Sequence, residues 1–184
     1  MAIEFTVKSA NYLFLDLNNL RLYVLAKITK ANETNIHGNI ANPINLTLHS
    51  MFREIGIRLN CQNVSDTSQL YPYRSHIESL LNFCKEVKET RLLCEKLTQD
   101  TTGNKDVTAV GGNNAGLNSR AATFAKSTVV KLISRRHLNV FHQKRIIPPK
   151  IELYMKLMPS PNNFVCKSAA PAQNAHQENY MLVI

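Results

Sequence analysis

The histidine and serine side chains that could act in catalysis are scattered along this chain. Its six histidines form no familiar catalytic or metal-binding motif. His49 stands beside Ser50, and a histidine next to a serine can activate the hydroxyl as a nucleophile. Adjacent residues on a strand, however, point to opposite faces of the sheet, so these two side chains cannot easily reach each other. We therefore expect a packing or turn role for both residues.

The acidic residues and the cysteines also lack the spacing of an active site. Acidic side chains fall in separate predicted elements, at Asp16, Glu54, Glu78 and Asp106, which argues against paired carboxylates for acid–base catalysis. The four cysteines are far apart, at Cys61, Cys84, Cys94 and Cys166, whereas zinc knuckles and redox pairs need closely spaced cysteines. We expect no catalytic residue, no cofactor and no metal, and we expect the thiols to be reduced.

Positive charge is concentrated in the second half of the chain. Lysine and arginine outnumber aspartate and glutamate by 22 to 13, which gives a formal net charge of +9. Such a field attracts polyanions because binding releases their counterions. The candidate contacts are Arg135, Arg136, Lys144 and Arg145. No DNA- or RNA-recognition motif accompanies them. The sequence therefore predicts either a solvated basic face or non-specific contact with nucleic acid.

Apolar and polar residues alternate in several segments, which predicts that strands position these side chains. Alternation buries one face of a strand and leaves the other in water. The predicted strands are residues 3–7, 20–29, 44–48, 55–59, 130–133, 151–158 and 180–184. Polar and glycine-containing residues predict a loop at 32–42. The chain is therefore expected to be mainly β.

One helix and one long loop are expected among these strands. Pro72 opens a segment with apolar residues at three- and four-residue spacing, which predicts an amphipathic helix from about 72 to 97. Its apolar stripe consists of Ile77, Leu80, Leu81, Cys84 and Val87. Residues 98–119 are rich in Thr, Asn, Gly and Asp, which predicts an exposed loop. Gly111-Gly112 in this loop lacks the lysine of a phosphate-binding loop.

Four segments, in their order along the chain, carry a family resemblance. They are residues 12–29, 48–60, 71–82 and 130–157. Together they resemble the major capsid protein, or hexon, of Maverick/Polinton elements and the related adintoviruses. The motif residues shared with that family are His49, Ser50, Phe52, Tyr71, Pro72, Tyr73, Arg74 and Glu78. None of them is catalytic in the family, so the resemblance implies structural roles for all of them.

The tyrosine and arginine motif allows two interpretations. Taken alone, Tyr71, Tyr73 and Arg74 could bind a sugar or a phosphate. The resemblance instead implies an anchor between a strand and a helix, with both tyrosine rings packed and the Arg74 guanidinium bonded to backbone carbonyls.

The resemblance implies an architecture as well as a function. The expected fold is an all-β, antiparallel jelly-roll sandwich with one inserted α-helix. It would span residues 1–184 as a single domain and correspond to the N-terminal half of a double jelly-roll protein. In that family three copies form a capsomer, and capsomers tile an icosahedral shell. The resemblance thus implies a virion protein, assembled in the nucleus or cytoplasm of the host cell, which forms homotrimers and contacts other capsid proteins. A truncated or endogenised copy would also explain why only one jelly roll is present.

Length and composition agree with one globular domain, and two other functions remain open. The 184 residues suit a single core. No apolar run reaches the roughly 18 residues of a membrane span, so no membrane contact is expected. A non-viral jelly-roll module could bind a carbohydrate or a protein partner through its Asn-rich and Gly-rich loops. A cupin-like enzyme would need a clustered His/Glu ligand set, which the sequence does not show.

Overall fold

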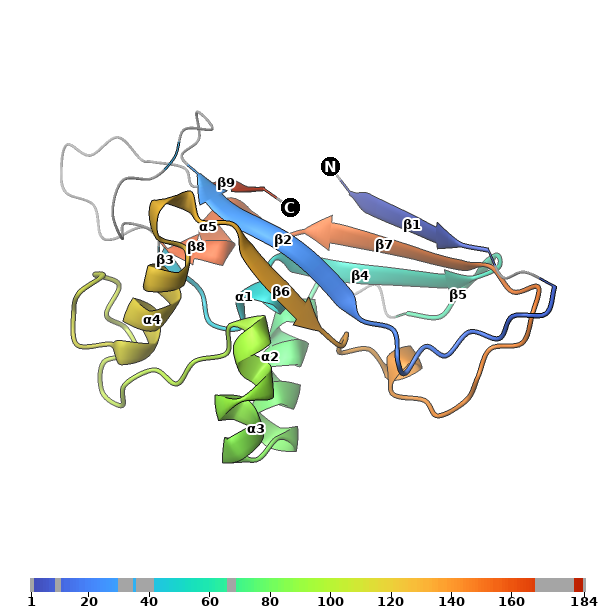
Figure 1. The fold of residues 1–184 in the computed structure, drawn as a ribbon, viewed down its shortest axis with the longest axis horizontal. Helices are drawn as coiled ribbons and strands as arrows, with labels where there is room; N and C mark the ends of the chain where they lie inside the picture. The colour runs from blue at the N-terminus through green and yellow to red at the C-terminus, as the bar shows by residue number, and fades with distance from the viewer. Residues whose placement is uncertain are drawn as a thin grey trace. The chain divides into compact units, whose positions relative to one another are not determined.

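The computed structural model describes residues 2–8, 11–29, 35, 42–65, 69–167 and 181–183. These residues form antiparallel β-sheets accompanied by short helices (Figure 1). The mainly β fold predicted from the alternation is therefore confirmed. Two compact units can be distinguished: the first contains residues 1–22, 52–82 and 135–160, and the second contains residues 23–51, 83–134 and 161–184.

The first unit is built on a four-stranded antiparallel sheet. Its strand order is β1 (Ile3–Val7), β7 (Leu153–Pro159), β4 (Phe52–Leu59) and β5 (Gln62–Asn63). Met155 at the centre of β7 pairs with Phe5 on one side and with Ile57 on the other. Figure 1 shows β1, β7 and β4 running side by side. β7 is far in sequence from both of its neighbours, β1 and β4, whereas β4 and β5 are joined by a short turn.

Alternation explains which side chains of this sheet are buried. Ile55 and Ile57 of β4 are buried, as are Leu153, Met155 and Leu157 of β7. The intervening residues of β7, Tyr154 and Lys156, are partly exposed. The predicted strands at 3–7, 55–59 and 151–158 are thus confirmed, with β4 beginning three residues earlier at Phe52.

The predicted helix from 72 to 97 is wrong in its length. The chain forms three separate helices here, α2 (Tyr71–Asn82), α3 (Lys85–Glu89) and the 3₁₀ helix η1 (Arg91–Glu95). Cys84 is extended, with ψ of 168°, and Thr90 has φ of −120° and ψ of −82°. Two short breaks, at Phe83–Cys84 and at Thr90, interrupt the predicted helix, yet they leave the three- and four-residue spacing of the apolar residues unchanged. Periodicity alone could not reveal the breaks.

The predicted orientation of α2 is also wrong. The residues of α2 that are buried are Tyr71, Pro72, Ser75 and Ser79. The apolar stripe lies at the surface, with Ile77 56% exposed, Leu80 48% and Leu81 78%. Within the first unit α2 packs against β4, and small serine side chains permit a close approach. Serine side chains of α2, and not its leucines, therefore face the interior of the unit.

The second unit contains a three-stranded and a two-stranded sheet. The first has the strand order β6 (Val130–Ser134), β2 (Leu22–Thr29) and β9 (Met181–Val183), and the second pairs β3 (Asn42–Pro43) with β8 (Cys166–Lys167). β2 lies in this unit from Tyr23 onward. Figure 1 shows β6 and β2 adjacent and running in opposite directions. The strands predicted at 20–29 and 130–133 are confirmed as β2 and β6, and the described part of the strand predicted at 180–184 forms β9.

Short helices of the second unit correct two further predictions. Residues 44–48 do not form a strand, because α1 (Thr47–Ser50) begins there after Leu46, which has a left-handed backbone with φ of 56°. The loop predicted at 98–119 ends earlier, since α4 (Ala115–Thr123) starts after Asn114, whose side chain accepts a hydrogen bond from the Leu117 N–H. The remaining elements are η2 (Ala125–Ser127) and α5 (Asn162–Val165).

One buried cluster of the second unit is formed by leucines from separate segments. Leu46, Leu92 and Leu97 form a buried cluster, and Phe83 and Val87 pack against it. Val87 belongs to the predicted apolar stripe and lies on α3, whereas Phe83 lies between α2 and α3. The loop predicted at 32–42 lies outside the described residues except for Asn35 and Asn42. No helix within the described ranges is long and apolar enough to cross a bilayer.

Candidate functional site

A cluster of ionisable side chains lies in the first unit between α2 and the segment around η3 (Asn139–Phe141). Arg74 and Glu78 lie one turn apart on α2, and Arg74 Nε donates to Glu78 Oε1 at 2.8 Å. The other carboxylate oxygen, Glu78 Oε2, is 2.8 Å from His137 Nδ1 and 3.7 Å from His142 Nε2. Arg74 Nη2 also donates to Asn139 Oδ1 at 2.5 Å. The two segments are therefore tied together through Arg74 and Glu78.

Local structure explains why these groups meet. An i, i+4 spacing places Arg74 and Glu78 on the same face of α2. η3 lies between His137 and His142 in the chain, and their ring centroids are 6.4 Å apart. Both imidazoles consequently approach one carboxylate. The histidines are scattered in the sequence, and no motif spacing links Glu78 to His137 or His142.

The electrostatics of the cluster favour an ionised Glu78. Burial by itself would raise the pKa of Glu78, but the hydrogen bonds from Arg74 and His137 outweigh it, so this pKa lies below its usual range. Exposure rises across the cluster, from 7% for the His137 side chain through 23% for Glu78 to 48% for His142. The carboxylate is therefore charged at neutral pH, and one side of the cluster meets solvent.

The structure supports only part of the predicted strand-to-helix anchor. Tyr71 is buried, and its hydroxyl accepts a hydrogen bond from the His137 N–H at 3.4 Å. Tyr73 is 56% exposed, so its ring is not packed as expected. Within the described residues, the planar guanidinium of Arg74 donates to the side chains of Glu78 and Asn139, and the expected bonds to backbone carbonyls are not observed. Pro72 is buried in the first turn of α2.

The predicted polyanion contacts separate into exposed and buried residues. Lys144 and Arg145 are exposed, and Arg135 is partly exposed. Arg136 is only 1% exposed, which contradicts its assignment to a polyanion-binding surface. Its guanidinium stacks over Phe141 at 4.0 Å and donates to the Leu20 carbonyl, while burial lowers its pKa to about 10. Arg136 therefore holds the first unit together.

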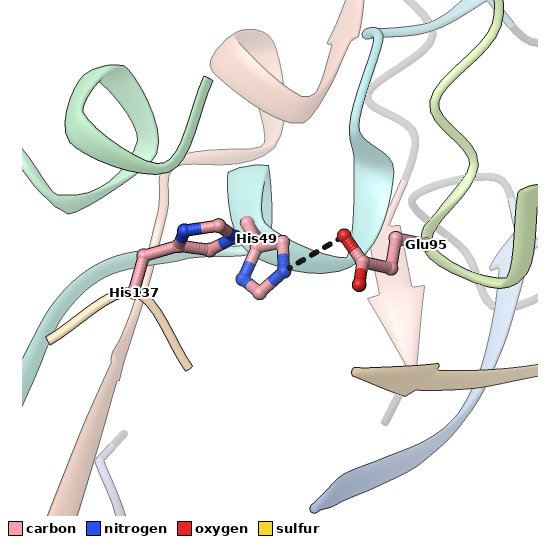
Figure 2. Close-up of side chains that lie close together, drawn as sticks. All are labelled: His49, Glu95 and His137. Atoms are coloured by element: carbon pink, nitrogen blue, oxygen red, sulfur yellow. Dashed lines mark ion pairs between the residues drawn. The ribbon is translucent and has the colours of Figure 1, made fainter. Parts of the chain in front are cut away.

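His49 and Ser50 lie on α1 in the second unit and have different partners. His49 Nε2 lies 2.9 Å from Ser134 Oγ and 3.4 Å from Glu95 Oε2. Figure 2 shows the Glu95 carboxylate directed at the His49 ring. Ser50 Oγ donates to the Asn45 carbonyl at 3.1 Å. The prediction that His49 and Ser50 lie on a strand is wrong, because both residues belong to the helix α1.

Ser134, His49 and Glu95 have the residue types of a catalytic triad but not its geometry. Ser134 Oγ donates to Glu95 Oε1 at 2.6 Å, and both residues approach the same ring nitrogen, His49 Nε2. In a triad, the serine and the acid contact opposite ring nitrogens. All three residues are at most 4% exposed, so a substrate has no access. This network supports the fold of the second unit.

A small cavity of about 80 Å³ lies in the second unit beside β3 and α4. Its lining includes Asn42, Asp100, Lys105 and Arg120. Arg120 is buried and donates to the Pro43 carbonyl at 3.0 Å, while its Nη2 is 3.0 Å from Asp100 Oδ1. Asn42 is 1% exposed, and its Oδ1 has no hydrogen-bond partner among the described residues. The cavity has room for ordered water or a small polar group.

Comparisons with family models, curated proteins and solved structures found no match.

The four cysteines are expected to react in two classes. Cys61, Cys84 and Cys94 are exposed, whereas Cys166 is buried and its pKa is raised to about 12 by that burial. Because the thiolate is the reactive form, a thiol reagent at neutral pH should modify three cysteines of the native protein quickly. Cys166 should react only after unfolding, as measured by mass spectrometry of the labelled peptides. Equal labelling of Cys166 in the native protein would contradict the burial of β8.

Proposed function

We propose that this chain is a structural shell protein of the hexon type, which assembles with copies of itself through its surfaces. The observation that carries the proposal is the orientation of α2. This helix turns its arginine and glutamate toward other parts of its own unit and leaves Ile77, Leu80 and Leu81 at the surface. Clustered apolar side chains at a surface are typical of protein–protein contacts. Their burial on association would contribute about 25 cal/mol for each Å² of apolar area.

A sheet edge offers a second surface for association. β1 is an edge strand of the four-stranded sheet in the first unit. Phe5 is 46% exposed and Val7 is 39% exposed on this strand. An edge strand with apolar side chains can pair or pack with another chain. Assembly into trimers, and contact with other capsid proteins, would cover both surfaces.

The proposal includes a finer architecture than the β-rich class. We assign an antiparallel jelly roll with an inserted helix, equivalent to the first half of a double jelly-roll capsid protein. Support comes from the order β1-β7-β4, in which the first strand pairs with a strand from the end of the chain. Such pairing between distant strands is expected of Greek-key connections. Lys144 and Arg145 would provide non-specific contact with a packaged genome within the virion.

A small-ligand-binding module is the second candidate function. It is favoured by the cavity beside β3, where the buried Asn42 Oδ1 lacks a partner. The loop that lines this cavity contains the Asn- and Gly-rich residues identified in the sequence. A carbohydrate hydroxyl could donate to Asn42 there.

Light scattering coupled to size-exclusion chromatography separates the two candidates. For a shell protein we expect trimers or larger assemblies of the 20.8 kDa chain, whose proportion grows with protein concentration. A stable monomer that binds glycans on an array would reject the shell function and support the binding module. A monomer that binds no glycan would reject both.

A further inference from the structure

We propose that Glu78, His137 and His142 form a binding site for a divalent transition-metal ion, with zinc as the expected ion. The three side chains come from α2 and from both sides of η3, and each offers one ligand atom within 4.8 Å of the other two. Two imidazoles and one carboxylate are a ligand set that zinc accepts. This site is independent of the self-assembly proposed above.

The distances suit a tetrahedral ion. Zinc lies about 2.0–2.2 Å from nitrogen and oxygen ligands, so two ligand atoms of a tetrahedron are about 3.4 Å apart. Glu78 Oε2 is 2.8 Å from His137 Nδ1 and 3.7 Å from His142 Nε2. These two separations bracket the tetrahedral value. Small side-chain rotations would therefore admit the ion without moving α2.

A hydrogen-bond network alone does not account for His142. Its Nε2 is 3.7 Å from Glu78 Oε2, which is too long for a hydrogen bond. This nitrogen nevertheless lies near Glu78 Oε2, the same oxygen that contacts His137 Nδ1. A metal ion at this position would be coordinated by both imidazoles. The 48% exposure of the His142 side chain leaves room for a water molecule as the fourth ligand.

Arg74 and Asn139 provide the support that metal ligands require. Arg74 binds Glu78 Oε1 and leaves Oε2 facing the two imidazoles. Asn139 accepts from the same guanidinium and so fixes the position of η3 relative to α2. Outer residues that orient ligands in this way commonly influence metal affinity by about 10–100-fold. A bound ion would join α2 to η3.

Isothermal titration of the 184-residue chain with zinc chloride, in the presence of a phosphine reductant, tests the site. We expect one zinc ion per chain. His142→Ala removes the most exposed ligand, and we expect it to weaken binding by roughly 10-fold or more. His76→Ala is the matched control, because it also removes an imidazole from the α2 region but lies outside the cluster. This control should bind zinc like the wild type.

A second probe separates this site from the cysteines. Cobalt(II) bound to nitrogen and oxygen ligands gives weak visible absorption bands without the intense near-ultraviolet bands of thiolate ligation. The proposal is overturned if the wild type does not bind zinc, if His142→Ala binds as tightly as the wild type, if both histidine variants lose binding equally, or if thiolate bands appear. Far-ultraviolet circular dichroism confirms that each variant is folded.

Discussion

Phe52→Ala is expected to lower the free energy of unfolding by about 3–5 kcal/mol. Phe52 begins β4, pairs with Pro159 of β7 and is fully buried. Removal of its ring deletes buried apolar surface and leaves a cavity in a densely packed interior. A register irregularity lies next to this residue, between Phe52 and Glu54.

Urea denaturation followed by circular dichroism measures this effect. The matched control is Phe5→Ala on β1, where the ring is 46% exposed, and the expected loss is below about 1 kcal/mol. Equal losses for the two variants would show that Phe52 does not occupy the core of the first unit.

Arg120→Met is expected to cost about 3 kcal/mol of stability in the second unit. Its guanidinium joins the Pro43 carbonyl, Thr98 Oγ1 and Asp100 at distances of 3.0, 2.5 and 3.0 Å. Methionine fills a similar volume but leaves these acceptors without their donor. The Asp100 side chain is 20% exposed, so water can replace part of the lost interaction. The expected loss of stability is therefore near the lower end of the range for a broken buried ion pair.

Lys105→Met is the control for this variant, because Lys105 is an exposed cation at the same cavity. We expect it to change stability by less than about 0.5 kcal/mol. The midpoints of thermal unfolding of both variants and the wild type give the comparison. A stability of Arg120→Met within error of the control would refute the role assigned to Arg120.

The strands could be predicted from sequence because alternation directly records which face of a strand is buried. The burial of β2, β6 and β7 follows this pattern, and that of β4 follows it in part, whereas β1 is a strand without a buried residue. The helical region was predicted less well. Its apolar residues are correctly recognised as a stripe, but periodicity does not determine whether a stripe faces the interior or a surface. In α2 the serines Ser75 and Ser79 face inward, since a small side chain permits close packing that leucine would prevent.

The candidate metal site could not be predicted for a different reason. Glu78 and His137 are 59 residues apart, and only the tertiary structure brings them together. The exposure of charged residues is equally hidden in the sequence. Arg136 and Arg135 are adjacent and chemically identical, yet Arg136 is buried against Phe141. Composition indicated a basic segment but not which of its charges solvent can reach.

The central claim is that copies of this chain associate through the apolar surface of α2. The most direct test compares the wild type with a double variant that carries Ile77→Asp and Leu81→Asp. Sedimentation equilibrium at equal concentrations measures the mass of each protein in solution. We predict a wild-type mass at least three times the 20.8 kDa of one chain and a variant mass equal to one chain, with unchanged circular dichroism. A wild type that remains monomeric at every concentration, or a variant as large as the wild type, would contradict the account.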